Sequence, residues 1–190
     1  MGKQFNAMIP PHIEFIAEQK MFFVATAAAE GKVNLSPKGM DSFRVLNQQQ
    51  VVWLNLTGSG NETAAHLKQN PRMTIMFCAF EGKPVILRLY GQANAIHCGD
   101  DEWQQYIALF PEQQGARQLY LLDIDLVQSS CGMSVPLYDF VSQRDDLANW
   151  ASKQGEQGIH QYWAKKNQHS LDGVATDILS LSGLAQEAEN

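Results

Sequence analysis

Runs of alternating apolar and polar residues occupy most of the chain between residues 22 and 127. Seven runs have the length and pattern of β-strands, and they lie at 22–29, 32–38, 43–46, 51–56, 73–80, 85–96 and 119–127. Short polar turns, such as residues 30–31 and 81–84, join neighbouring runs into antiparallel hairpins. The pattern therefore predicts a mainly antiparallel β-sheet or barrel with flanking helices.

Helical spacing is found before, within and after this strand-rich region. Pro10 and Pro11 precede an amphipathic stretch that we expect to end before Met21, and a second short helix is expected at about 100–110. The first helix would open the domain. The second would interrupt the strands once.

After Pro136 the chain becomes polar and helical. Ser142 and Asp145 fit a capping box at the start of one helix, and Ile159 and Trp163 lie one turn apart in a second helix. We therefore expect two helices in this part of the chain. From residue 167 onward little in the sequence fixes the structure.

The run at 33–38 gathers polar side chains on one face. Because side chains alternate along a strand, Asn34, Ser36 and Lys38 share a face, opposite the apolar residues. Pro37 has no N–H to donate to a neighbouring strand, so this strand is expected at a sheet edge or at its own end. The Lys38 ammonium group is then free to meet a ligand.

Two other runs predict different degrees of burial. Residues 73–80 are nearly all apolar, which predicts a strand covered on both faces. In residues 85–96, Arg88 and Tyr90 lie on the polar face and Leu89 lies on the apolar one. This second strand is expected to be covered on one face only.

A glycine-rich turn at residues 57–63 leads from a strand into a short helix. Gly58 and Gly60 can take a positive φ, and the helix that follows offers unpaired N–H groups. One interpretation is structural: Ser59 and Glu62 would form a capping box and no ligand would bind. A second is functional: the helix N–H groups, Asn61 and Thr63 would hold one phosphate, with a cation from another strand.

A third interpretation is a dinucleotide fingerprint, because residues 58–63 read G-x-G-x-x-T and Glu81 lies near the position of a ribose-binding acid. The third glycine of that fingerprint is missing. The surrounding hairpins also do not fit the parallel sheet that it needs.

Composition limits the classes of function. The 190 residues suit one domain, or one domain with a helical tail, and the net charge of −6 with scattered basic residues argues against nucleic-acid binding. Three cysteines form neither a disulfide framework nor a zinc motif, and five histidines lack metal-ligand spacing, so no metal is expected. No signal peptide or bilayer-length apolar run is evident, so we expect a cytoplasmic protein that does not bind a membrane.

Several segments together resemble the pyridoxamine 5′-phosphate oxidase-like family of FMN-binding split barrels. The segments are residues 25–27 with 31–39, then 57–63, 70–73 and 87–91. Residues 130–136 and 166–173 are also similar to one branch of that family. The resemblance covers about residues 10–136 well and the remainder less specifically.

The resemblance implies a six-stranded antiparallel split β-barrel at 1–136 and a C-terminal helical extension at 137–190, which packs on the barrel or on a dimer partner. It also implies a homodimer with FMN bound in a cleft at the dimer interface. The residues expected at the cofactor are Asn34, Ser36, Lys38, Gly39, Thr57, Gly60, Asn61, Thr63, Arg72 and Arg88.

One departure concerns the cation that holds the phosphate. The family's oxidases carry a Ser-Arg-Lys run where this chain has Asn61-Glu62-Thr63. The cation must then come from elsewhere, and Lys38 is the first candidate, followed by Arg72 and Arg88.

The function implied by the resemblance is that of an FMN-dependent oxidoreductase acting on a small organic molecule by hydride transfer at the flavin. NADH or NADPH is a possible electron donor. No catalytic side chain can be assigned, because the cofactor carries the chemistry. The changed phosphate run argues against true pyridoxamine phosphate oxidation. The alternative is a non-enzymatic flavin or haem binding or storage protein on the same dimer.

Overall fold

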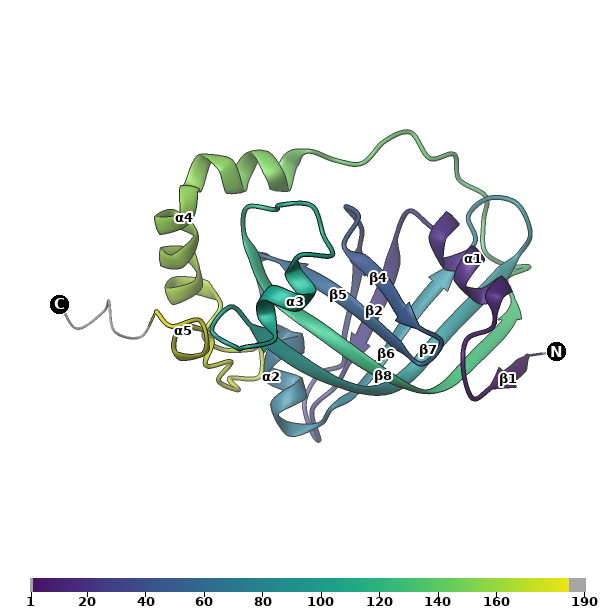
Figure 1. The fold of residues 1–190 in the computed structure, drawn as a ribbon, viewed down its shortest axis with the longest axis horizontal. Helices are drawn as coiled ribbons and strands as arrows, with labels where there is room; N and C mark the ends of the chain where they lie inside the picture. The colour runs from purple at the N-terminus through teal and green to yellow at the C-terminus, as the bar shows by residue number, and fades with distance from the viewer. Residues whose placement is uncertain (1, 185–190) are drawn as a thin grey trace.

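The computed structural model describes residues 2–184 of the chain. Eight strands form one antiparallel sheet with the order β3-β2-β6-β7-β8-β5-β4, and β1 pairs with β8 (Figure 1). The strands are β1 (Lys3–Phe5), β2 (Phe22–Thr26), β3 (Asn34–Lys38), β4 (Phe43–Asn47), β5 (Gln50–Leu56), β6 (Arg72–Cys78), β7 (Val85–His97) and β8 (Ala116–Cys131). The expected mainly antiparallel fold is confirmed, with eight strands in place of six.

In the described part of the chain, five helices flank the sheet. They are α1 (Pro10–Glu18), α2 (Glu62–Gln69), α3 (Trp103–Ile107), α4 (Asp146–Lys166) and α5 (Ile178–Leu181). Within residues 2–184 no helix combines the length and apolarity needed to cross a membrane.

The longest strands, β7 and β8, lie side by side at the centre of the sheet. The first half of β8 pairs with β5, its second half pairs with β1, and β7 lies along the opposite side. At the irregularity after Tyr90, a Cβ atom on Gly91 would lie 1.9 Å from the Asp123 carbonyl oxygen. Only glycine allows β7 and β8 to approach this closely, which explains why the motif at 87–91 ends in glycine.

Apolar side chains from the inner face of the curled sheet fill its centre. Aromatic rings of Phe22, Phe43 and Phe77 meet there at centroid distances of 5.0–5.8 Å, beside Trp53 and Tyr120, which are stacked at 4.8 Å. Burial of this apolar area is the main source of the stability of such a fold.

The expectation that residues 73–80 are covered on both faces is wrong in the single chain, because only one face of this strand is buried. Met73, Ile75 and Phe77 are buried, whereas Thr74 and Met76, on the opposite face of β6, are only half-buried. The alternation of burial shows that this strand contributes one face to the core. In β7 the predicted alternation is confirmed, with Leu89 buried and Arg88 and Tyr90 half-buried.

The two capping boxes proposed from the sequence are not formed. Helix α2 has Asn61 at its N-cap and α4 has Asp145 there, and neither makes a side-chain capping hydrogen bond. Helix α4 bends at Gly155, whose φ of +63° interrupts the helical backbone and divides it into the two helical parts that the sequence predicts.

The chain after β8 crosses the molecule and returns to the end where α2 lies (Figure 1). There, the indole N–H of Trp163 donates a hydrogen bond of 2.8 Å to the Thr57 hydroxyl oxygen. Ala151, Ile159, Trp163 and Ile178 form a small apolar cluster of their own. Of the expected extension at 137–190, residues 185–190 lie outside the described part of the chain.

Candidate functional site

A cavity of about 550 Å³, called here the polar pocket, lies between β3, the glycine-rich turn and the segment after α4. Most of its lining is polar. The residues are Asn34, Ser36, Lys38, Trp53, Asn55, Leu56, Gly58, Ser59, Gly60, Asn61, Glu62, Thr63, Arg117, Lys166, His169, Ser170 and Leu171. Six of the ten residues expected at the cofactor therefore meet in one cavity.

The edge strand β3 supplies one wall of the polar pocket. It ends the sheet order, as the proline predicts, and its polar face points into the pocket. The Ser36 hydroxyl donates to the Asn34 side-chain oxygen at 3.1 Å, and the Asn34 amide donates to the Thr63 hydroxyl oxygen at 3.3 Å. This chain of hydrogen bonds joins the strand to the first turn of α2.

The N-terminus of α2 supplies a second wall. The helix begins at Glu62, and its first intrahelical bond runs from the Ala65 N–H to the Asn61 carbonyl oxygen. The N–H groups before Ala65 therefore point out of the helix end, where the dipole favours an anion. Buried Asn61 and Thr63 stand at this end.

Arg117 is the cation that sequence analysis missed. It lies near the start of β8, is only 3% exposed and lines the polar pocket. Its Nε donates to the Gln118 side-chain oxygen at 3.0 Å, and its Nη1 donates to the Asn167 side-chain oxygen at 2.7 Å. Both acceptors are neutral.

No carboxylate within residues 2–184 forms an ion pair with Arg117. Burial lowers the pKa of its guanidinium to about 10, because removal from water disfavours the charged form. Nearby, the Asn61 side-chain oxygen and the Gln118 side-chain nitrogen are buried without a hydrogen-bond partner in the described structure. Buried polar groups are normally paired, and of these two residues Asn61 lines the polar pocket whereas Gln118 does not.

Lys38 stands at the boundary of two cavities. Its Nζ lies 5.1 Å from the centroid of the Trp53 ring, and burial together with the charge of Arg117 lowers its pKa to about 8. The two cations thus raise the positive potential of the same region.

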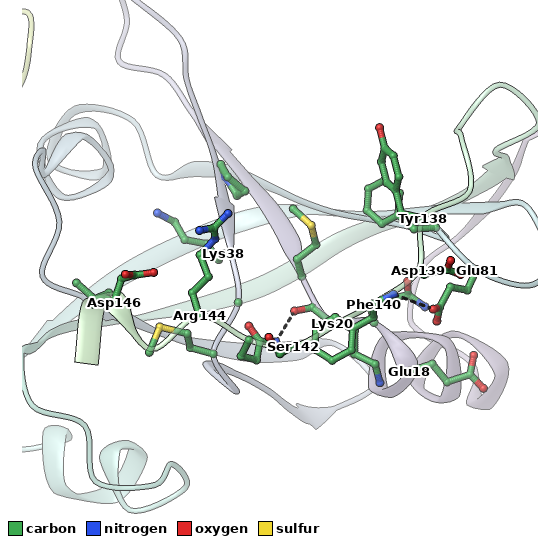
Figure 2. A pocket seen from close by; sticks show the side chains of 18 residues that line it. Glu18, Lys20, Lys38, Glu81, Tyr138, Asp139, Phe140, Ser142, Arg144 and Asp146 are labelled. Carbon is green, nitrogen blue, oxygen red and sulfur yellow. Dashed lines mark hydrogen bonds between the residues drawn. The ribbon is translucent and has the colours of Figure 1, made fainter. Parts of the chain in front are cut away.

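The second cavity, called here the larger pocket, has a volume of about 710 Å³ and shares Lys38 with the polar pocket. Apolar and aromatic side chains line part of it, including Met21, Met40, Phe80, Tyr138 and Phe140. Figure 2 shows Lys38 and Arg144 toward one end of this pocket and Tyr138 and Glu81 toward the other.

The segment between β8 and α4 forms one side of the larger pocket. The Phe140 N–H donates to the Glu81 carboxylate at 3.3 Å, and the Gln143 side chain donates to the Lys20 carbonyl oxygen at 3.2 Å (Figure 2). These bonds hold the segment against the barrel.

Four residues expected at the cofactor lie outside the polar pocket. Gly39 lines the larger pocket, and the Thr57 hydroxyl is occupied by Gly115 and Trp163. Arg72 is exposed and donates to the Asn70 side chain at 3.1 Å, while Arg88 donates to Ser130 at 3.2 Å. Neither arginine lines the polar pocket or the larger pocket.

Glu62 is held by the segment after α4. Both of its carboxylate oxygens accept the Leu171 N–H at 3.0 Å, and Glu62 also lines the polar pocket. This contact replaces the capping role that the local sequence suggests.

Comparison with known proteins shows the family. Residues 9–131 match the family model described as pyridoxamine 5′-phosphate oxidase, which includes β3, the glycine-rich turn and Arg117. The chain is also 35% identical over 179 residues to the pyridoxamine 5′-phosphate oxidase family protein ustO of Aspergillus flavus, covering 85% of this chain and 72% of that protein. The chain belongs to the pyridoxamine 5′-phosphate oxidase family.

Solved structures share the fold at low sequence identity. A candidate pyridoxamine 5′-phosphate oxidase of Lactobacillus delbrueckii superposes with a TM-score of 0.52 at 20% identity, covering 65% of this chain and 94% of that one. A HupZ variant of group A Streptococcus gives a TM-score of 0.50 at 17% identity, covering 64% and 98%. About a third of this chain therefore lies outside the fold that it shares with each of these structures.

Proposed function

We propose that this family member binds FMN and that the polar pocket receives the FMN phosphate. The observation that carries the proposal is Arg117, a buried guanidinium whose hydrogen-bond partners among residues 2–184 are all neutral. An unpaired buried charge is costly, and a phosphate would supply both the counter-charge and a planar pair of acceptors for the guanidinium fork.

Several further groups of the polar pocket can donate to a monophosphate, whereas the Glu62 carboxylate accepts the Leu171 N–H and takes no part in holding the phosphate. The N–H groups at the start of α2 and the Thr63 hydroxyl can donate to phosphate oxygens, as at other helix N-termini that bind anions. Lys38 adds a second positive charge from β3. This division of roles accounts for the absence of the Ser-Arg-Lys run, because the cations reach the phosphate from two strands.

The larger pocket is our proposed place for the flavin ring system. It begins at Lys38, beside the proposed phosphate site, and its volume and aromatic lining suit a flat ring system. Bound flavin supplies hydride-transfer chemistry, and the protein's part is to position the ring and exclude water. We therefore propose a flavin-dependent oxidoreductase acting on a small organic molecule, with NADH or NADPH as electron donor.

Charge in the larger pocket argues against a phosphorylated substrate. Its cations are Lys20, Lys38 and Arg144, and its carboxylates are Glu18, Glu81, Asp139 and Asp146. With three cations against four carboxylates, the pocket offers no excess of positive charge for a second phosphate. We propose that the reaction differs from pyridoxamine phosphate oxidation for this reason.

We further propose a homodimer with the cofactor at its interface. Large apolar side chains are exposed in the segment after β8, with Met133 at 82%, Leu137 at 75% and Val141 at 91% exposure. Such a concentration is typical of a protein interface. Native mass spectrometry of the FMN-loaded protein should give two chains with two cofactors, and a loaded monomer would contradict the proposal.

The test of function is a two-step titration of the purified protein. FMN is added first and binding is followed by quenching of flavin fluorescence. NADH or NADPH is then added anaerobically and bleaching near the visible flavin bands is recorded. Failure to bind FMN would reject the whole proposal. Binding without reduction, and without turnover across a substrate panel, would reject the enzymatic part and favour flavin storage.

A further inference from the structure

The Arg117 guanidinium is held at its Nε and Nη1 atoms. The Nε–H donates to the Gln118 side-chain oxygen at 3.0 Å, and the Nη1–H donates to the Asn167 side-chain oxygen at 2.7 Å. Among residues 2–184 the Nη2 group donates no hydrogen bond, although Arg117 is buried and lines the polar pocket. The two bonds therefore fix the plane of the guanidinium and leave Nη2 for a ligand.

The barrel supplies the bond at Nε. Gln118 follows Arg117 on β8 and pairs with Asn55 of β5, whose side-chain amide donates to the same Gln118 oxygen at 2.9 Å. This oxygen thus accepts from both residues, and the paired strands hold it in place. One point of the guanidinium is therefore set by the sheet alone.

The bond at Nη1 comes from outside the barrel. Asn167 follows α4, beyond residues 9–131 that match the family model, and is fully buried. Its backbone N–H donates to the Trp163 carbonyl oxygen at 2.9 Å, and its carbonyl oxygen accepts the Thr176 hydroxyl at 2.6 Å. Asn167 is therefore fixed both by the helix before it and by the chain after it.

The side-chain amide of Asn167 has its orientation set by two different partners. Its oxygen faces the Arg117 donor, and its nitrogen donates to the Gly58 carbonyl oxygen at 3.1 Å. The reverse orientation would bring donor against donor and acceptor against acceptor. The Asn61 side chain also donates to the Asn167 carbonyl oxygen at 3.4 Å. Asn167 thus links the arginine to the glycine-rich turn and to the N-cap of α2.

We propose that Asn167 is a positioning residue of the phosphate site, which directs the Arg117 guanidinium into the polar pocket without cancelling its charge. The inference rests on the proposed function and deepens it. An amide oxygen can hold a guanidinium but carries no full charge, so the cation stays available to an anion. A carboxylate at the same place would form an ion pair with Arg117 and compete with the phosphate. Holding the cation before the ligand arrives also reduces the entropy lost on binding.

The experiment measures the dissociation constants of FMN and riboflavin by fluorescence titration of full-length variants. The ratio of the riboflavin constant to the FMN constant reports what the phosphate contributes. We expect Asn167→Ala to lower this ratio about threefold, because one hydrogen bond to Arg117 is lost. Asn167→Asp should lower it further, by at least about tenfold, because its carboxylate occupies the guanidinium. A residue that only supports the fold would change both constants together and leave the ratio unchanged.

Asn70→Asp is the matched control. The Asn70 side-chain oxygen accepts the Nε–H of exposed Arg72 at 3.1 Å, and neither residue lines the polar pocket. The same charge is thus added beside another arginine, and the ratio should stay at the wild-type value. A wild-type ratio in either Asn167 variant, or an equal loss in Asn70→Asp, would overturn the inference. Absence of flavin binding, or a wild-type ratio in Arg117→Ala, would instead reject the proposed function.

A measurement on the ligand-free wild type tests the inference even if the variants do not fold. Bonds at Nε and Nη1 should restrict rotation of the guanidinium, so the Nη1 and Nη2 groups of Arg117 should give separate signals in nitrogen-edited NMR spectra. Arg72 is exposed and should give a single averaged Nη signal. An averaged signal for Arg117 would show that Asn167 does not hold the guanidinium and would overturn the inference.

Discussion

The polar pocket and the larger pocket share Lys38 but differ in how the charges of their lining residues are balanced. In the polar pocket a buried arginine has only neutral partners among the described residues, whereas the larger pocket carries cations and carboxylates side by side. A fixed, uncompensated cation suits one defined anion. A balanced and partly apolar lining suits a ligand recognised mainly by shape.

Of the substitutions considered, loss of the buried Arg117 should weaken FMN binding most. We expect Arg117→Ala to weaken FMN by roughly 2–5 kcal/mol, at least about 30-fold, because a buried charge pair is lost. Riboflavin, which lacks the phosphate, should lose little. Fluorescence titrations with both ligands separate a phosphate effect from a general loss of fold.

Arg72→Ala is the matched control for Arg117→Ala. Arg72 is exposed on β6 and lines neither of the two pockets, so its removal should change FMN affinity by less than about 0.5 kcal/mol. A loss in Arg72→Ala as large as that in Arg117→Ala would remove the distinction between the two arginines.

Lys38→Ala should have the next largest effect. One charge-assisted hydrogen bond is worth roughly 1.5–3 kcal/mol, so FMN should bind about 10- to 150-fold more weakly. The loss is expected to be smaller than that for Arg117, because Lys38 is only half-buried. Unchanged affinity in a titration would exclude Lys38 from the phosphate site.

The pH dependence of FMN affinity tests whether the Lys38 ammonium group contacts the phosphate. Burial and Arg117 lower the pKa of Lys38 to about 8, so the free protein loses this positive charge as pH rises through 8. The phosphate is already a dianion there, since its second pKa is about 6. FMN affinity should therefore fall between about pH 7.5 and 9, while riboflavin affinity stays level.

Lys38→Met supplies the control for this pH profile. The variant has no titrating ammonium group at the site, so the fall in FMN affinity between about pH 7.5 and 9 should disappear. A wild-type profile that is flat across this range, or a fall that persists in the variant, would assign the effect to another group.

Changes in the larger pocket should have the smallest effect on cofactor phosphate binding. Arg144→Ala removes a cation from the larger pocket, where we place the flavin ring, and leaves the proposed phosphate-binding residues unchanged. The ratio of the FMN and riboflavin dissociation constants should therefore change by less than about 0.5 kcal/mol. The Michaelis constant for the organic substrate should change instead. Steady-state kinetics of the FMN-loaded variant measures this separately, and a large change in the ratio of FMN to riboflavin affinity would show that Arg144 acts on the phosphate.

The parts of the site that could be predicted are those formed by residues close together in the sequence. The polar face of β3 and the helix start at Glu62 follow from patterns within a few residues, and the structure brings Asn34, Ser36, Lys38 and Thr63 together in one cavity. Arg117 carries no such pattern. It reaches the site only because β8 pairs with β5, a register that one sequence does not reveal.

Long-range contacts also explain the errors. The Ser59–Glu62 capping box is a sound local expectation, but the Glu62 side chain bonds to Leu171, more than one hundred residues away in sequence. Likewise β1 is only Lys3–Phe5, too short to show alternation, and is defined by its pairing with β8. Tertiary contacts overrode local preference in both cases.

The most direct test of the central claim is a crystal structure of the protein with FMN bound. We expect a phosphate oxygen within about 3.2 Å of the Arg117 guanidinium, at the N-terminus of α2 and inside the polar pocket. An FMN phosphate placed elsewhere, with Arg117 still bonded only to Gln118 and Asn167, would contradict it.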